Sequence, residues 1–296
     1  MAPDDDGAQS WGAQLARATQ ALAGRATATA HDEALTLLSA FLGEPPTLVL
    51  ARPSTAMRAT KAEAFAGWVA RRLAGEAIPR ITGSLAFMGL DLMVAHDSPL
   101  VSPAAQRLVE VALECARSRT SGETAGETSG ERSGELSGAE LGAGCGAVAL
   151  ALVTFEPRFA RIYAIDPSPD ALRVAVANGG RYLVNLVIDW RQGDGLDPVP
   201  EPVDMIVCDL AAQSMPSALA RLLAQAPAKL RPGGVLLCAL EREMEVEVVE
   251  ALARALRAAR IWTTPAHDQW VVVVAQVPRL SSGQTRGAAF ESGRGI

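Results

Sequence analysis

A glycine-rich segment in the second half of the chain has the composition of a ligand-binding loop. It reads Glu-Leu-Gly-Ala-Gly-Cys-Gly over residues 140–146 and is followed directly by the small, helix-forming run AVALAL. Glycines at alternate positions let the backbone turn sharply and approach a ligand without clashes from Cβ atoms. The N–H groups at the start of the following helix would meet that ligand. The segment therefore predicts a cofactor loop, whose ligand-binding residues we take to be Glu140, Gly142, Gly144 and Gly146.

The spacing of these glycines distinguishes two classes of cofactor. A dinucleotide-binding fingerprint spaces them as GxGxxG and holds a phosphate on the helix. Here the spacing is GxGxG, and the carboxylate of Glu140 stands two residues before Gly142. A carboxylate close to a sulfonium and an amino group is favourable. The loop therefore indicates the phosphate-free cation S-adenosylmethionine as the cofactor.

Two further acidic residues follow predicted strands downstream of the loop. Asp166 ends the run RIYAID, twenty-four positions after Gly142, where a carboxylate can accept from both ribose hydroxyls. Asp194 ends the run Arg-Gln-Gly-Asp, where it can accept from the adenine amino group. Either acid alone is equally compatible with a turn or a helix cap. Three acidic positions in this order, each at the carboxyl end of a strand, favour an adenosyl site.

The overall composition is that of a folded protein whose core is built from Ala, Leu and Val. Of the 296 residues, 49% are hydrophobic and only 4% aromatic, and the net charge is −6. This charge argues against a protein that coats nucleic acid or an anionic membrane. One local excess of positive charge lies in residues 52–80, where six Lys or Arg stand against two Glu.

Cysteines, histidines and the N-terminus bear on metal binding, disulfide formation and the cellular compartment. The four cysteines and three histidines lack metal-ligand spacing, so neither a metal site nor a disulfide framework is expected. The N-terminus has no secretory signal, and no apolar run reaches the roughly 18–20 residues that cross a bilayer. We therefore expect a cytoplasmic protein.

Helices are predicted before residue 84 and alternating strands and helices after residue 140. Apolar periodicity predicts helices over 11–22, 31–42 and 61–74, a β-hairpin over 84–94 and a helix over 104–116. Later strands are expected at 161–165, 183–188, 205–210, 235–240 and 270–277, with helices near 147–155, 169–177, 217–230 and 242–258. Such alternation is typical of a doubly wound α/β sheet that is mostly parallel.

Between these two parts the chain repeats in tetrads such as SGET and SGER, which cannot bury a core. Ser137 and Gly138 also occupy the place of the first sheet strand, where they weaken it. We divide the chain into a helical domain (1–83), a hairpin and connecting helix (84–117), a flexible linker (118–139), a cofactor-binding domain (140–280) and a disordered tail (281–296).

Several short segments outside the glycine loop match one family pattern. They are Arg71-Arg-Leu-Ala-Gly-Glu76, Ile81-Thr-Gly83, Phe87-Met-Gly-Leu90, Leu108-Val-Glu110, Ile165-Asp-Pro-Ser-Pro-Asp-Ala-Leu172, Asn178 and Leu230-Arg-Pro-Gly-Gly234. Over residues 11–278 the chain thus resembles the HemK/PrmC family, the N5-glutamine methyltransferases of peptide chain release factors. The resemblance implies a seven-stranded Rossmann-like methyltransferase sheet and a small domain that docks the release factor. It also implies a role in translation termination, through methylation of the glutamine in the GGQ motif.

The chain departs from the family at its catalytic motif, Asn-Pro-Pro-Tyr after the fourth strand. Here the site reads Asp-Leu-Ala-Ala over residues 209–212. An amide nitrogen is a poor nucleophile because its lone pair is delocalised, so a site must hold both N–H groups through acceptors. In the family the Asn side chain and a Pro carbonyl do this, and the Tyr packs the planar substrate. By that analogy the catalytic acceptors are Asp209 and the carbonyl of Leu210.

The loss of the prolines and the aromatic ring leaves three hypotheses open. The first is a methyltransferase acting on a protein amide. The second is a methyltransferase with another substrate, a small molecule or RNA. The third is a catalytically silent paralogue that binds cofactor or a translation partner. Methylated release factor would support the first hypothesis, and binding without turnover would support the third.

Overall fold

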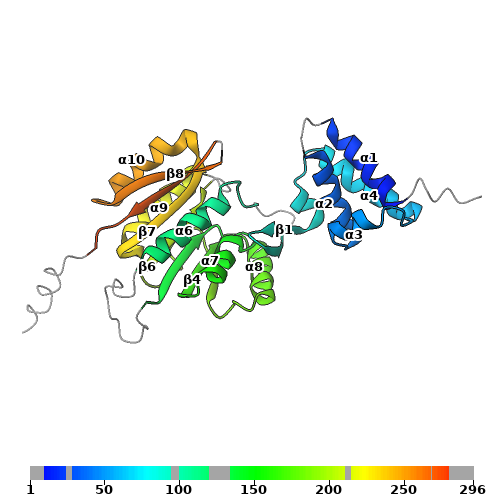
Figure 1. The fold of residues 1–296 in the computed structure, drawn as a ribbon. Helices are drawn as coiled ribbons and strands as arrows, with labels where there is room; N and C mark the ends of the chain where they lie inside the picture. Colours follow the sequence, from blue (N-terminus) through cyan, green and yellow to red (C-terminus); the bar gives the residue numbers. More distant parts are fainter. Residues whose placement is uncertain are drawn as a thin grey trace, which may run out of the picture. The chain divides into compact units, whose positions relative to one another are not determined.

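The computed structural model describes residues 10–24, 29–94, 100–119, 134–210, 215–267 and 269–279 (Figure 1). The chain divides into two units, of which the first ends at Ser84 and the second begins at Leu85. The predicted tail from residue 281, most of the predicted linker, and Ala211 and Ala212 lie outside the described residues.

The first unit is helical. Its helices are α1 (Trp11–Ala23), α2 (Ala30–Leu42), α3 (Pro46–Ala51), α4 (Ala59–Leu73) and α5 (Ile78–Thr82). Leu22, Leu37 and Phe65 lie at the centre of its core. The three helices expected from periodicity are confirmed. Helices α3 and α5 were not foreseen, because each spans under two turns and shows only a proline in its first turn as a signal.

Ion pairs neutralise part of the positive charge of residues 52–80. Arg72 on α4 pairs with Glu33 on α2 at 2.7 Å, and both side chains are largely buried. Arg71 pairs with Glu76 at 2.5 Å. Hydrogen bonding to Glu33 raises the pKa of Arg72 further above its usual value. These two arginines therefore stabilise the helical unit, and the charge available to a partner is smaller than the sequence count indicates.

The second unit is built on a seven-stranded sheet in the order β5-β4-β3-β6-β7-β9-β8. Strand β9 runs antiparallel to β7 and β8, and the remaining neighbours are parallel. The strands are β3 (Leu136–Leu141), β4 (Phe159–Asp166), β5 (Ile188–Gln192), β6 (Val203–Asp209), β7 (Leu230–Glu241), β8 (Arg260–His267) and β9 (Trp270–Gln276). The predicted doubly wound α/β fold is confirmed.

Helices cover both faces of this sheet (Figure 1). On one face α6 (Ala105–Ser118) and α7 (Ala147–Phe155) form a core with the sheet, and α8 (Pro169–Arg181) packs against β4 and β5. On the other face lie α9 (Met215–Lys229), the short 3-10 helix η3 (Arg242–Met244) and α10 (Glu245–Ala255). The predicted hairpin is present as β1 (Ser84–Phe87) and β2 (Leu90–Met93), and its apolar side chains join the α6–α7 core.

Strand β3 corrects the sequence prediction of a linker through residue 139. All six of its residues are buried, and it pairs with β4 and β6 in the middle of the sheet. The Ser137 hydroxyl, which looked unfavourable there, donates to the Asp204 carboxylate at 3.1 Å, and the Ser137 N–H donates to it at 2.9 Å. A buried polar group costs little when it is hydrogen-bonded, so a serine is tolerated in this central strand.

Two edge strands also differ from expectation. The predicted strand 183–188 is wrong, because Leu183 and Leu186 are 87% and 92% exposed and β5 begins only at Ile188. The apolar run lies in the connection that precedes the strand. Strand β8 was not predicted, since this edge strand is largely exposed and carries no apolar run.

Candidate active site

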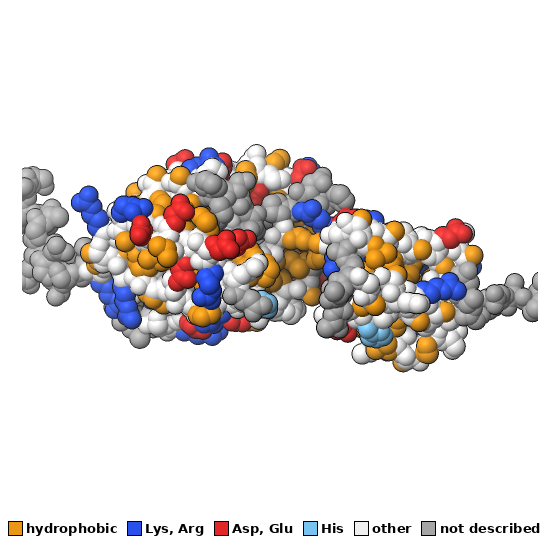
Figure 2. Space-filling view, turned by 90° about the horizontal axis from the view of Figure 1, so that it is seen from above, with side chains coloured by type: hydrophobic (Ala, Val, Ile, Leu, Met, Phe, Trp, Pro, Cys, Tyr) orange, Lys and Arg blue, Asp and Glu red, His pale blue; other side chains and the backbone are white. Residues whose placement is uncertain are grey.

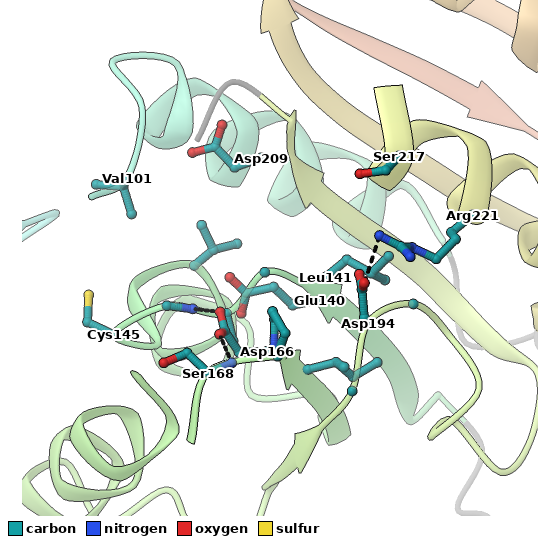
Figure 3. A pocket seen from close by; sticks show the side chains of 18 of the residues that line it. Val101, Glu140, Leu141, Cys145, Asp166, Ser168, Asp194, Asp209, Ser217 and Arg221 are labelled. Atoms are coloured by element: carbon teal, nitrogen blue, oxygen red, sulfur yellow. Dashed lines mark hydrogen bonds and ion pairs between the residues drawn. The ribbon is translucent and has the colours of Figure 1, made fainter. Parts of the chain in front are cut away.

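A cavity of about 480 Å³ opens at the carboxyl ends of the central strands (Figure 3). Its volume lies within the range of about 300–1,000 Å³ that is usual for small-molecule sites. Six of the residues predicted from the sequence line it: Glu140, Gly142, Gly144, Asp166, Asp194 and Asp209. Residues without a sequence prediction also line it, among them Leu100, Val101, Cys145, Ser168, Ser217 and Arg221.

The other two predicted residues are not among the described residues that line this cavity. Leu210 is fully buried, and its side chain packs in the core on the α9–α10 face. Gly146 precedes α7 with a φ of 85°, and a Cβ added to it would lie 2.7 Å from the Trp190 ring. Gly146 therefore serves the packing of the loop against β5.

Replacing Gly146 with alanine is expected to lower the free energy of unfolding by about 2 kcal/mol or more. The new methyl group would meet the Trp190 ring, which is held by a 2.8 Å hydrogen bond from its Nε1 to Asn185, and the left-handed backbone would be strained. Gly138→Ala is the control, since its Cβ would make an ordinary 3.4 Å contact with Phe159. Denaturant unfolding measures both, and equal losses would contradict the assignment.

Glu140 lies at the end of β3 and faces both the cavity and the start of α7. Its Oε2 accepts the Ala149 N–H at 2.9 Å. Burial raises the pKa of the Glu140 carboxyl well above its usual value; the Ala149 N–H opposes this, and the charges of Asp166 and Asp209 reinforce it. The Ala149 N–H, which was expected to donate to the ligand, thus donates to Glu140 instead. With this N–H group already hydrogen-bonded, the start of α7 is less suited to binding a phosphate.

Asp166 fixes the glycine loop against the start of α8. One carboxylate oxygen accepts the Gly144 N–H at 2.8 Å, and the other accepts the Ser168 N–H at 2.8 Å. Ser168 in turn caps α8, since its hydroxyl accepts the Ala171 N–H. Because each carboxylate oxygen can accept more than one hydrogen bond, Asp166 retains the capacity to bind ribose hydroxyls.

Asp194 follows β5 and forms an ion pair with Arg221 on α9 at 2.7 Å (Figure 3). Both side chains are about half exposed. No pattern in the sequence indicated Arg221, because it lies on a helix that shows no motif and is far from Asp194 along the chain.

Asp209 ends β6 and is buried. Its Oδ2 accepts the Ser102 N–H at 2.8 Å. This bond brings the segment before α6 to the cavity, where Leu100 and Val101 form part of the wall. The side chain of Asp209 is therefore held in a defined position at the wall of the cavity.

Asn178 on α8 is a supporting residue to which the sequence analysis assigned no role. It is fully buried, and its side-chain amide donates to the carbonyls of Met93 and Cys145, both at 2.9 Å. Its Oδ1 accepts the Met93 N–H at 2.9 Å. One amide thus joins the hairpin to the glycine loop.

Four carboxylates around one cavity suit a cationic ligand. Glu140, Asp166, Asp194 and Asp209 all line it, and Arg221 is the one cation among its described lining residues. A pyrophosphate would meet repulsion there, whereas a sulfonium or an ammonium group would be attracted.

Within the described part of the chain, no cluster of three or more His, Cys, Asp or Glu has a metal-binding arrangement, and no helix could cross a membrane.

Two family models match the chain: the PrmC N-terminal domain over residues 13–83 and the methyltransferase small domain over residues 131–272. Both models and the curated relatives support the resemblance of the chain to the HemK/PrmC family. A release factor glutamine methyltransferase of Aliivibrio fischeri is 29% identical to this chain over 197 residues, which are 66% of the chain and 63% of that protein. One of Pseudomonas aeruginosa is 34% identical over 85 residues, 29% of the chain and 31% of that protein. The chain thus spans less than two thirds of these relatives.

Among solved structures, this chain shares its fold with a tRNA methyltransferase of M. jannaschii. The TM-score is 0.50 at 13% identity, over 67% of the chain and 57% of that protein. At this identity the similarity shows the fold alone.

Proposed function

We propose that this protein is an S-adenosylmethionine-dependent methyltransferase that methylates the glutamine side chain in the GGQ motif of a peptide chain release factor. The observation that carries the proposal is the position of Asp209, an oriented acceptor at the wall of a cavity lined by carboxylates. Similarity to the PrmC N-terminal domain and to relatives named for this reaction supports the same substrate.

The residues around the cavity fit the cofactor. When bound, S-adenosylmethionine supplies a methyl group on a positively charged sulfur, which makes that carbon electrophilic. Glu140, Asp166 and Asp194 all line the cavity. With the cofactor bound, Glu140 would attract this charge, Asp166 would accept from the ribose hydroxyls and Asp194 from the adenine amino group. Gly142 and Gly144, both with positive φ, let the backbone approach the ligand closely.

Asp209 prepares the amide nitrogen for attack. One of its oxygens accepts the Ser102 N–H, and we assign the acceptance of a glutamine N–H to the other. The Leu210 carbonyl, the second acceptor expected from the sequence, belongs to a fully buried residue outside the described lining of the cavity, so we assign it no role. S-adenosylmethionine held at Glu140, Asp166 and Asp194 would supply the methyl group, the nitrogen that Asp209 orients would receive it, and the amide would lose one proton to water. Positioning of this kind accounts for a large part of the rate of group transfer.

Asp209→Asn, which restores the residue of the family, is expected to lower turnover by about tenfold to a hundredfold. An asparagine has a single acceptor oxygen, so the Ser102 N–H and the glutamine N–H would compete for it. Radiolabelled methyl transfer measures the effect. Asp170→Asn, an exposed residue of α8, is the control and should retain full turnover. Faster turnover of Asp209→Asn would show that Asp209 does not use both oxygens.

The proposal is tested by methyl transfer from labelled S-adenosylmethionine to a release factor with an intact GGQ loop, followed by mass spectrometry. Label on that glutamine is the expected result. Cofactor binding without transfer would indicate a silent paralogue, and label on another molecule would indicate a different substrate. On the face of the second unit drawn in Figure 2, acidic and basic side chains are interspersed, so the described residues there form no continuous basic surface for RNA.

A further inference from the structure

The Asp194–Arg221 ion pair combines an acceptor and a donor at one wall of the cavity. The carboxylate and guanidinium lie 2.7 Å apart, and both residues line the cavity. They come from different parts of the fold, the loop after β5 and helix α9. In Figure 3 the pair lies across the cavity from Val101 and Cys145. A ligand edge that reaches this wall meets an acceptor and a donor side by side.

The edge of adenine has the complementary pattern. Its amino group is a donor, and ring nitrogens next to that group are acceptors. We propose that Arg221 binds adenine together with Asp194, Arg221 donating to a ring nitrogen while Asp194 accepts from the amino group. This inference rests on the proposed function, since it assigns a further residue to the same cofactor site.

The charge of Arg221 agrees with this role. A cation in a site for a cationic cofactor is unfavourable unless it is neutralised or kept away from the sulfonium. Asp194 neutralises it, and our assignment of the adenine amino group to Asp194 puts the guanidinium at the nucleobase end. A half-exposed ion pair contributes little to folding stability, so the pair is available for ligand recognition, and its loss would leave the fold intact.

The test pairs a change in the protein with a change in the ligand. Calorimetry compares S-adenosylhomocysteine with its 7-deaza and 1-deaza analogues, each of which lacks one ring nitrogen. The wild-type protein should bind one analogue about tenfold more weakly than the parent, as expected for the loss of a hydrogen bond to a charged donor. Arg221→Ala should bind that analogue and the parent with equal affinity. The analogue that is affected identifies the nitrogen.

Arg254→Ala is the control, because Arg254 lies on α10 in an exposed pair with Glu250 and not at the cavity. It should retain the preference of the wild type, and all three proteins should have similar melting temperatures. The inference would be overturned if Arg221→Ala still bound S-adenosylhomocysteine more tightly than the analogue, or if the wild type bound the parent and both analogues with equal affinity. Either result would leave the proposed function intact. A wild type that does not bind S-adenosylhomocysteine would overturn both.

Discussion

Replacing Asp204 with alanine is expected to lower the free energy of unfolding by about 3–5 kcal/mol, the usual cost of removing one partner from a buried ion pair. Asp204 is 2% exposed and holds two arginines: Arg119 at 2.9 Å through one oxygen, and Arg231 at 3.0 Å through the other. The second oxygen also accepts both the N–H and the hydroxyl of Ser137. Alanine would deprive these four donors of their shared acceptor.

Denaturant unfolding of Asp204→Ala beside Asp170→Ala measures this effect. Asp170 pairs with Arg173 on the surface, where both side chains are more than two-thirds exposed, so its loss should cost less than about 1 kcal/mol. A similarly small loss for Asp204→Ala would mean that the network does not stabilise the centre of the sheet.

Glu140→Gln is expected to stabilise the free protein at neutral pH while weakening the binding of S-adenosylmethionine about tenfold or more. Glutamine can still accept the Ala149 N–H, so the contact with α7 is preserved. It removes a carboxyl whose ionisation is opposed by burial. The same substitution also removes the ionisable group to which we assign the attraction of the sulfonium.

The pH dependence of both effects follows from the raised pKa of Glu140. Between the ordinary carboxyl pKa and this raised value, the folded protein keeps a proton that the unfolded chain has lost, so wild-type stability falls as pH rises through that window. Binding of a cation favours the ionised form, so cofactor affinity rises with pH over the same window and a proton is released. Melting temperatures and calorimetry at several pH values measure these trends. If melting temperature and cofactor affinity changed equally with pH in Glu140→Gln and in the wild type, the assignment of these effects to Glu140 would be contradicted.

The sequence predicted those parts of the site that depend on local order along the chain. Alternate glycines require a tight loop, and strands that run parallel place their carboxyl ends together, so Glu140, Asp166, Asp194 and Asp209 meet at one cavity. The contacts that orient these residues could not be predicted. Ser102 reaches Asp209 across 107 positions, a separation at which no spacing rule applies.

Errors in the fold have a related cause. Composition suggested that Ser137 and Gly138 lie in or beside a linker, but the hydrogen bonds to Asp204 make β3 a central strand. The apolar run over 183–188 was taken as a strand because periodicity does not reveal which apolar residues stay exposed. In both places tertiary contacts outweighed local preference.

The buried carboxylate of Asp204 also bears on how this chain can change in length. Helix α6 ends at Ser118 and β3 begins at Leu136, yet Arg119 and Ser137 bond to the same side chain. The distance between Arg119 and Ser137 is thus set by their shared partner Asp204 on β6. It does not depend on the number of residues that connect them. Repeat units can be gained or lost between the anchors at a small entropic cost. A change in length at this point of the chain should therefore leave the pairing of β3 with β4 and β6 unaltered.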